Sequence, residues 1–271
     1  MPKSRAEEYV EKLADELVRL TPYALKRTGL VQSQVFVKIE DYSLICAPYQ
    51  LSMKQGIFLV VLSPQEIRFF QRYEKKLCSI DLTFQKTGSK KPLSMLLRGR
   101  LERIGAVKGK KNVCMLDASI KGCPNELVEI IGDYITAFDG LKNQFESFKD
   151  RVIVVEETAA KLMRFNYYAE IVLNGASTRA SLKSLSVNKL TINLPRVPPG
   201  LAEGQPCQVK LYFQVYQFAA NGKVTSLTQV QGGWTAVTVE IGFTPELIEI
   251  VDDYFFRRGV LGRAAAPAPT A

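Results

Sequence analysis

The sequence contains no histidine. That absence excludes the Ser-His and Cys-His nucleophile systems, the His-rich metal sites and the most common general base. A P-loop, a glycine-rich dinucleotide fingerprint and a clustered pair of acids are missing too. Lysine- or carboxylate-based chemistry stays open, but we expect a protein that is not an enzyme.

Long apolar runs are missing as well. No stretch approaches the ~20 apolar residues that span a bilayer. The first twenty residues are charged throughout and have no apolar signal core. We therefore expect a cytoplasmic protein that does not insert into a membrane.

Cysteine is scarce and poorly placed for bridges or metals. The five cysteines are odd in number and widely spaced, and none forms a C-x-x-C pair. We expect reduced core residues, with no disulfide and no metal. They are Cys46, Cys78, Cys114, Cys123 and Cys207.

Acidic residues are outnumbered, which leaves a formal net charge of +9. Such a charge favours an anionic partner: a nucleotide, a nucleic acid or an acidic protein. The excess is greatest between Lys86 and Lys111, where nine Lys or Arg accompany a single acid, Glu102. This segment is either a solvated basic face or a nucleic-acid surface, and nucleic acid is the less favoured partner.

The N-terminus has a helical pattern. Ser4 and Glu7 form an S-x-x-E capping box, and apolar residues then recur at helical spacing as far as Leu20. We predict an amphipathic helix over residues 1–20.

The remaining chain consists of two sets of short runs rich in Val, Ile, Leu and Phe, each followed by a helical stretch. The two helical stretches repeat, because "NELVEIIGDYI" and "PELIEIVDDYF" match at an offset of 120 residues. A strong hairpin cue, Asn221-Gly222, lies in the second set. Trp234 is expected to anchor the core or the barrel rim rather than to stack on a ligand.

These patterns predict a mainly β protein with helices. We expect two small antiparallel six-stranded β-barrels, each followed by a C-terminal helix, because closure removes exposed sheet edges. The expected divisions are an N-terminal helix at 1–20, a first barrel with its helix at 21–140, a linker at 141–150, a second barrel with its helix at 151–258 and a disordered tail at 259–271.

The second half resembles the PilZ domain, the six-stranded barrel that binds the bacterial second messenger cyclic di-GMP. The first half resembles the divergent PilZ-like module that precedes a PilZ domain in certain bacterial two-domain proteins, notably in spirochaetes. The resemblance implies a signalling or adaptor protein with cyclic di-GMP as its ligand. It also implies a protein partner, for example in motility or envelope machinery.

The family motif begins with R-x-x-x-R before the first barrel strand, where arginine forks hold phosphates and guanine edges. Here this element falls in "KLMRFNYYAEIVL", where Arg164 is the only arginine. If Arg164 is the first of the pair, Tyr168 stands at the second position. If it is the second, Ala160 stands at the first, with Lys161 beside it.

The second family element is D/N-x-S-x-x-G at a turn. Here Ser184 stands in place of the acid, Ser186 is retained, and Lys189 stands in place of the glycine that lets the backbone approach the ligand. The resemblance thus implies a ligand site with these candidate residues: Lys161, Arg164, Tyr168, Arg179, Lys183, Ser184, Ser186 and Lys189.

Three functions follow from these residues. The first is a cyclic di-GMP receptor, in which Tyr167 or Tyr168 stacks on a base. The second is a degenerate module that acts on protein partners without a ligand. The third is nucleic-acid binding through residues 86–111, which would show a steep salt dependence.

Overall fold

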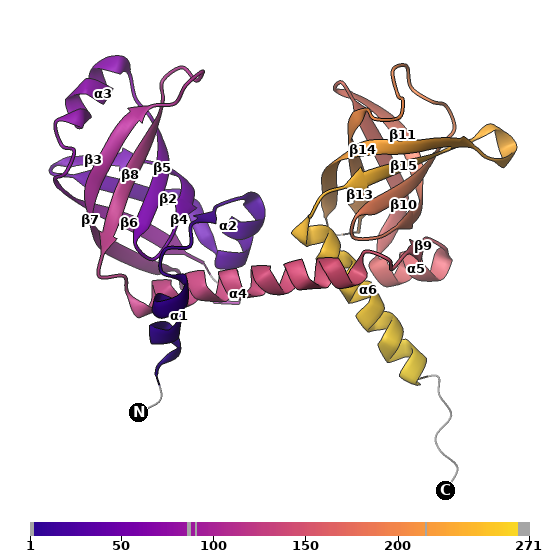
Figure 1. Cartoon of the computed structure of the whole chain (residues 1–271), viewed down its shortest axis with the longest axis horizontal. Coiled ribbons are helices and arrows are strands. Elements are labelled where there is room, and N and C mark those ends of the chain that lie inside the picture. Colours follow the sequence, from indigo (N-terminus) through magenta and orange to yellow (C-terminus); the bar gives the residue numbers. More distant parts are fainter. Residues whose placement is uncertain (1–2, 86–87, 90, 215, 265–271) are drawn as a thin grey trace, which may run out of the picture. The chain divides into compact units, whose positions relative to one another are not determined.

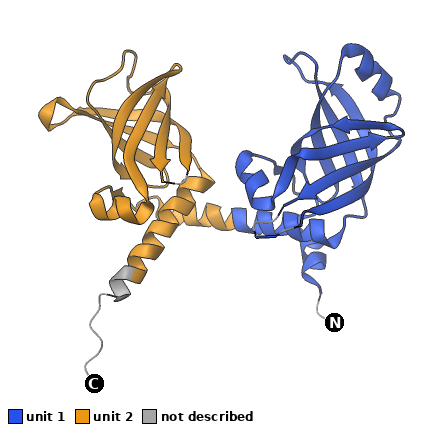
Figure 2. Cartoon of the chain, turned by 180° about the vertical axis from the view of Figure 1, so that it is seen from behind, with its two compact units in different colours: residues 1–138 blue, residues 139–271 orange. Residues whose placement is uncertain are grey.

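A computed structural model describes residues 3–85, 88–89, 91–214 and 216–264. The chain divides into two compact units, Met1–Phe138 and Asp139–Ala271 (Figure 2). Each unit pairs an antiparallel sheet with a long terminal helix (Figure 1).

The first unit contains strands at nearly every predicted run. Its elements in chain order are α1 (Arg5–Leu13), β1 (Val18–Arg19), α2 (Pro22–Thr28), β2 (Leu30–Ile39), β3 (Tyr42–Ile45), β4 (Ala47–Leu51), β5 (Gln55–Val61), α3 (Pro64–Gln71), β6 (Leu77–Phe84), β7 (Leu93–Ala106), β8 (Val113–Lys121) and α4 (Asn125–Phe148), whose last turns enter the second unit.

Helix α1 is shorter than the predicted span of 1–20. The predicted capping box is present, since Ser4 accepts from the Glu7 amide and the Glu7 side chain accepts from the Ser4 amide. The helix nevertheless ends at Leu13, and Val18 pairs instead with Leu51 of β4. Strand pairing therefore overrides the helical spacing of the last apolar residues.

The sheet of the first unit has the order β1-β4-β5-β8-β7-β6-β2-β3. Its ladder is not closed by a strand pairing among the described residues, so a closed six-stranded barrel is not confirmed here. Strands β3 and β4 lie toward opposite ends of this order, yet only Cys46 separates them in the chain. The Cys46 amide donates to the Val35 carbonyl at 3.0 Å. One bent segment, 42–51, thus pairs with β2 by its first part and with β5 by its second.

The second unit begins within α4, at Asp139. Its elements are β9 (Ile153–Val154), α5 (Glu157–Met163), β10 (Phe165–Leu173), β11 (Ala176–Leu185), β12 (Lys189–Leu194), β13 (Pro206–Phe213), β14 (Gln217–Gln229), the 3₁₀ turn η1 (Gln231–Gly233), β15 (Thr235–Ile241) and α6 (Pro245–Ala264).

The predicted closed six-stranded antiparallel barrel is confirmed in the second unit. The strand order is β10-β13-β14-β15-β12-β11, and β11 pairs again with β10 to complete the ring. Residues alternate between core and surface; in β10, Ala169 and Ile171 are fully buried while Tyr168 and Glu170 face outward. Strand β9 adds to β11 outside this ring.

The repeated helical motif occupies the same place in both units. In α4 the fully buried Leu127 contributes to the core of the first unit, and in α6 its counterpart Leu247 is also fully buried. One turn further along each helix, Ile131 of α4 and the corresponding Val251 of α6 are buried too. The terminal helices therefore cover the sheets with the face that the repeat predicts.

One prediction about a connection is wrong. Asn221-Gly222 is not a hairpin turn, because both residues lie within β14 and pair with Gln208 and Cys207. A β-carbon on Gly222 would come within 2.5 Å of the Glu240 carbonyl oxygen, so the glycine serves close strand contact. The segment 141–150, which the sequence marks as a helical or irregular linker, is helical as far as Phe148, where α4 ends.

The last helix is longer than predicted. Helix α6 continues to Ala264, past the expected start of the tail at 259, and residues 265–271 lie outside the described residues.

All five cysteines are free; four are buried as predicted, and Cys123 is partly exposed. Across the described part of the chain, no helix has the length and apolarity needed to cross a membrane.

Candidate functional site

The end of the second barrel that carries α5 holds most of the predicted ligand residues. The β10–β11 hairpin turns at Asn174 and Gly175, so the start of β10, the end of β11 and the start of β12 lie at the opposite end. Helix α5 enters there directly before β10.

Arg164 is fixed by an unusual backbone conformation. It ends α5 in the left-handed region, with φ 56°, and its amide donates to the Lys161 carbonyl at 3.1 Å. Its carbonyl accepts from the Gln214 amide at 2.9 Å. A non-glycine residue in this region stores about 1 kcal/mol or more of strain, which its surroundings must offset. The exposed Arg164 side chain is therefore carried on a firmly held turn.

The segment that follows Arg164 is irregular. Strand β10 has a register shift between Phe165 and Ala169, and Tyr167 adopts a φ of 59°. As a result Tyr167 is 51% exposed, available for stacking, and its hydroxyl lies 3.4 Å from the Glu157 carbonyl oxygen.

Ser186 lies in the turn between β11 and β12 and is only 2% exposed. Its hydroxyl donates to Asn188 Oδ1 at 2.8 Å and accepts from the Lys189 amide at 3.1 Å. Its own amide donates to the Lys189 carbonyl at 2.8 Å. The retained motif serine thus ties its own turn together.

The two lysines beside this turn are exposed. Lys183 lies at a register shift in β11, and its carbonyl accepts from the Val155 amide at 2.9 Å. Ser184 pairs with Val154 of β9 on one side and with Thr191 of β12 on the other. Strand β9 therefore pairs along the edge of β11 beside Ser184, the residue at the position of the family acid.

An ordered polar cluster lies on the outer face of the barrel. The Tyr168 and Tyr212 rings are 4.7 Å apart, and the Arg179 guanidinium lies 5.1 Å from the Tyr168 ring centroid. Glu170 accepts from Ser177 and from the Tyr168 hydroxyl, each at 2.5 Å. The hydrogen bond from Ser177, followed by that from Tyr168, lowers the pKa of Glu170.

The same hydrogen bond to Glu170 is the main cause that raises the pKa of Tyr168, because ionising the phenol would remove the donor. The result is a hydrogen-bonded surface on which a cation lies against an aromatic ring. Sequence reasoning missed Glu170 and Tyr212. The alternation along β10 and β13 predicts that both side chains face outward. Their proximity depends on how β10 is aligned with β13, and no sequence motif specifies that alignment.

The predicted residues therefore fall into two groups. Lys161, Arg164, Ser184, Ser186 and Lys189 lie at the α5 end of the barrel. Tyr168 and Arg179 lie on its outer face, and Lys183 is exposed beside β9, near the α5 end. Lys161 already pairs with Glu157 at 2.6 Å. Within the described ranges, no three His, Cys, Asp or Glu residues are grouped so that they could hold a metal.

The chain is thus a mainly β protein of two units, and the second unit is a closed six-stranded barrel with exposed cations at one end. Residues 4–137 match the PilZN3 domain. The chain therefore belongs to the PilZ-type proteins that carry an N-terminal PilZ-like module.

Three solved structures are similar to the chain. The PlzA protein of Borreliella burgdorferi in complex with c-di-GMP has 16% identity and a TM-score of 0.43, covering 92% of this chain and 98% of PlzA. YcgR of Escherichia coli in complex with c-di-GMP has 10% identity and a TM-score of 0.32, covering 97% of each chain. MotI of Bacillus subtilis, an inhibitor of motility, has 10% identity and a TM-score of 0.30, covering 86% of this chain and 99% of MotI.

No curated protein matches the sequence.

Proposed function

We propose that the chain is a non-enzymatic signalling protein in which residues 151–258 form a PilZ domain that binds cyclic di-GMP. The ligand would bind at the α5 end of the second barrel, and the protein would act on a protein partner, for example in motility or envelope machinery. One observation carries the proposal: behind a PilZN3 domain stands a closed six-stranded barrel with an exposed arginine, Arg164, held immediately before β10.

The chemistry of this end suits a phosphate-bearing ligand. The planar guanidinium of Arg164 can hold a phosphate or a guanine edge by two hydrogen bonds. Lys189 is exposed at the start of β12 and supplies a second cation. The exposed Tyr167 ring offers a face for a base.

Two contacts favour a second candidate, a module that acts on protein partners without a ligand. The Ser186 hydroxyl is used within its own turn, and Lys161 is paired with Glu157. Because these two polar side chains already have partners within the protein, fewer groups remain to bind a messenger.

Isothermal titration of the full chain with cyclic di-GMP tests the proposal. We expect saturable binding that Arg164→Ala weakens roughly tenfold to a hundredfold, the usual effect of losing a charged hydrogen bond. The matched control is Arg196→Ala, an exposed cation just beyond the end of β12, at the far end of the same barrel. Absence of heat at high protein concentration would leave the ligand-independent module as the function.

A further inference from the structure

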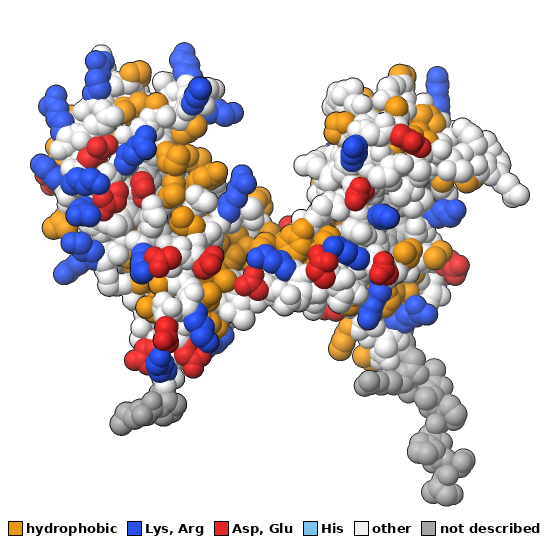
Figure 3. Space-filling model, viewed as in Figure 1, with side chains coloured by type: hydrophobic (Ala, Val, Ile, Leu, Met, Phe, Trp, Pro, Cys, Tyr) orange, Lys and Arg blue, Asp and Glu red, His pale blue; other side chains and the backbone are white. Residues whose placement is uncertain are grey.

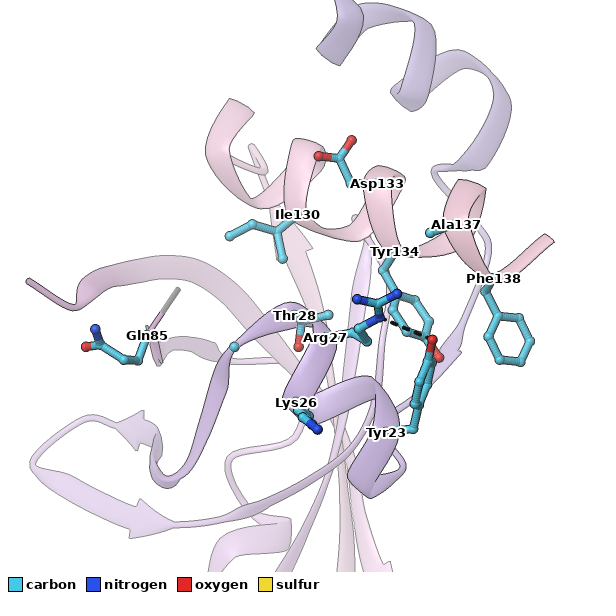
Figure 4. A pocket seen from close by; sticks show the side chains of 11 residues that line it. Tyr23, Lys26, Arg27, Thr28, Gln85, Ile130, Asp133, Tyr134, Ala137 and Phe138 are labelled. Carbon is cyan, nitrogen blue, oxygen red and sulfur yellow. Dashed lines mark hydrogen bonds between the residues drawn. The ribbon is translucent and has the colours of Figure 1, made fainter. Parts of the chain in front are cut away.

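The first unit contains a cavity of about 390 Å³ between α2 and α4. All of its lining residues belong to that unit. The volume falls within the range of small-molecule sites, ~300–1,000 Å³. Figure 4 shows the Tyr134 and Phe138 side chains pointing from α4 toward α2, and Arg27 and Tyr23 joined by a hydrogen bond.

The cavity lies at a position that both units share. Gly29 ends α2 and Arg164 ends α5, each in the left-handed region and each directly before a strand, β2 in the first unit and β10 in the second. The Gly29 carbonyl accepts from the Gln85 amide at 2.7 Å, as the Arg164 carbonyl accepts from Gln214. The next residues pair alike, Leu30 with Phe84 and Phe165 with Phe213.

The second unit fills this position with an arginine. Arg257 of α6 donates from Nη1 to the Leu162 carbonyl of α5 at 3.2 Å and thereby joins the two helices. In the helical repeat, the residue of α4 that corresponds to Arg257 is Ala137, which lines the cavity. A methyl group cannot reach α2, so the space that a side chain spans in the second unit is open in the first.

The walls of the open cavity are positively charged. Lys26 and Arg27 stand at its α2 side and are exposed. The single acid in the lining, Asp133, accepts from Arg5 and from the Tyr9 hydroxyl of α1, so its charge is offset by that helix. An anion entering the cavity therefore meets two cations and a carboxylate that already has partners.

The walls also present aromatic surface. The Tyr134 and Phe138 rings stack, with centroids 5.7 Å apart and planes inclined by 25°. Tyr23 is 8% exposed and lies under the Arg27 guanidinium, 5.7 Å from ring centroid to Cζ. Ring faces beside cations are the surroundings that favour a flat, negatively charged molecule.

From this geometry we propose that the first unit binds a small planar aromatic anion in the cavity between α2 and α4. The site is separate from the cyclic di-GMP site proposed on the second barrel and does not depend on it. The two claims can fail independently.

The probe for this site is 1-naphthyl phosphate, titrated into the full chain by calorimetry alongside inorganic phosphate and 2-naphthol. We expect saturable binding of 1-naphthyl phosphate, at least tenfold tighter than either fragment. Arg27→Gln and Phe138→Leu should each weaken it about tenfold or more, because they remove the cation and the stacked ring. Thermal unfolding of each variant verifies that it is folded.

Ala137→Arg is the decisive variant, since it copies the arginine of the second unit. It should abolish binding although it adds a positive charge. Thr136→Arg, on an exposed neighbour outside the lining, adds the same charge and should retain binding. Binding that survives Ala137→Arg, that is lost in Arg164→Ala, or that is absent from the unaltered chain up to millimolar probe would overturn the proposal.

Discussion

At the scale of single residues, close backbone contact explains positions that a sequence pattern misread. Gly222 was predicted to turn the chain, yet it runs within β14 against β15. The dipeptide Asn-Gly suits a turn because both residues tolerate a positive φ. Here the useful property of glycine is its missing side chain, and only the packing of β15 reveals that.

Gly222→Ala should therefore destabilise the second unit. The added methyl group would meet the Glu240 carbonyl oxygen at 2.5 Å and Val239 Cγ1 at 2.6 Å, so the strands must separate. We expect a loss of about 1–3 kcal/mol in the free energy of unfolding. Urea denaturation followed by the fluorescence of Trp234, the single tryptophan, reports on this unit. Gly242→Ala, where nothing lies within 4 Å, is the control and should be nearly neutral; equal losses would refute the contact argument.

Glu102 is the focus of a charged cluster on the first sheet. Hydrogen bonds from Lys75, Ser119 and Arg100, each at 2.7 Å, lower the pKa of its carboxyl group to about 2. Because this value lies below the usual 4.5, folding favours the charged form. The resulting stabilisation is complete above pH 4.5 and disappears as the pH falls through 2.

We therefore expect Glu102→Gln to reduce the stability of the first unit by about 1–2 kcal/mol near pH 7. The difference from the unaltered chain should shrink between pH 4.5 and pH 2, as urea denaturation across that range would measure. Glu16→Gln, an exposed acid of the same unit, supplies the control and should show little effect. A difference independent of pH would mean that the carboxylate is not the stabilising form.

At the scale of elements, one side chain of α6 is hydrogen-bonded to the backbone of α5. Arg257 donates to Asp253 on its own helix at 2.9 Å and to the Leu162 carbonyl on α5 at 3.2 Å. Helix α5 spans only Glu157–Met163 and has no side-chain N-cap. So short a helix depends on such tertiary contacts.

Arg257→Ala should loosen α5. Amide hydrogen exchange over residues 157–163 is expected to accelerate roughly fivefold or more, which corresponds to about 1 kcal/mol of lost local stability. Arg258→Ala, the exposed neighbour on the same helix, should leave exchange unchanged. Equal exchange in both variants would show that apolar packing alone holds α5.

The long elements could be predicted from the sequence, and three short helices could not. Strong apolar periodicity marks the strands and the repeated starts of α4 and α6. Helices α2, α3 and α5 have seven or eight residues and little periodicity. Two of them carry start signals that could have been read from the sequence, Thr21-Pro22 in α2 and Ser63-Pro64 with Glu66 in α3.

The candidate site could be predicted only in part. The motif comparison gave the position of Arg164 and of the Ser186 turn, because both are local in the chain. It could not give the partners of Ser186, the insertion of β9 beside Ser184 or the contact of Tyr168 with Tyr212. Those depend on strand register and on burial, which distant parts of the chain decide.

At the scale of the whole molecule, the two units repeat one arrangement of elements. Each unit ends in the same helical motif, and each places a short helix before a long strand, α2 before β2 and α5 before β10. The repeat in α4 and α6 was visible in the sequence. The sequence did not show that Ala137 lines an open cavity beside α2, whereas its counterpart Arg257 is hydrogen-bonded to α5. Small differences at equivalent positions thus give the units different surfaces.

We propose above all that cyclic di-GMP binds to the second barrel at its α5 end. Hydrogen–deuterium exchange of the full chain, with and without cyclic di-GMP, tests it most directly. We predict protection concentrated in residues 157–168 and 183–190, and none over α2. Unchanged exchange in both segments, or protection confined to the first unit, would contradict the claim.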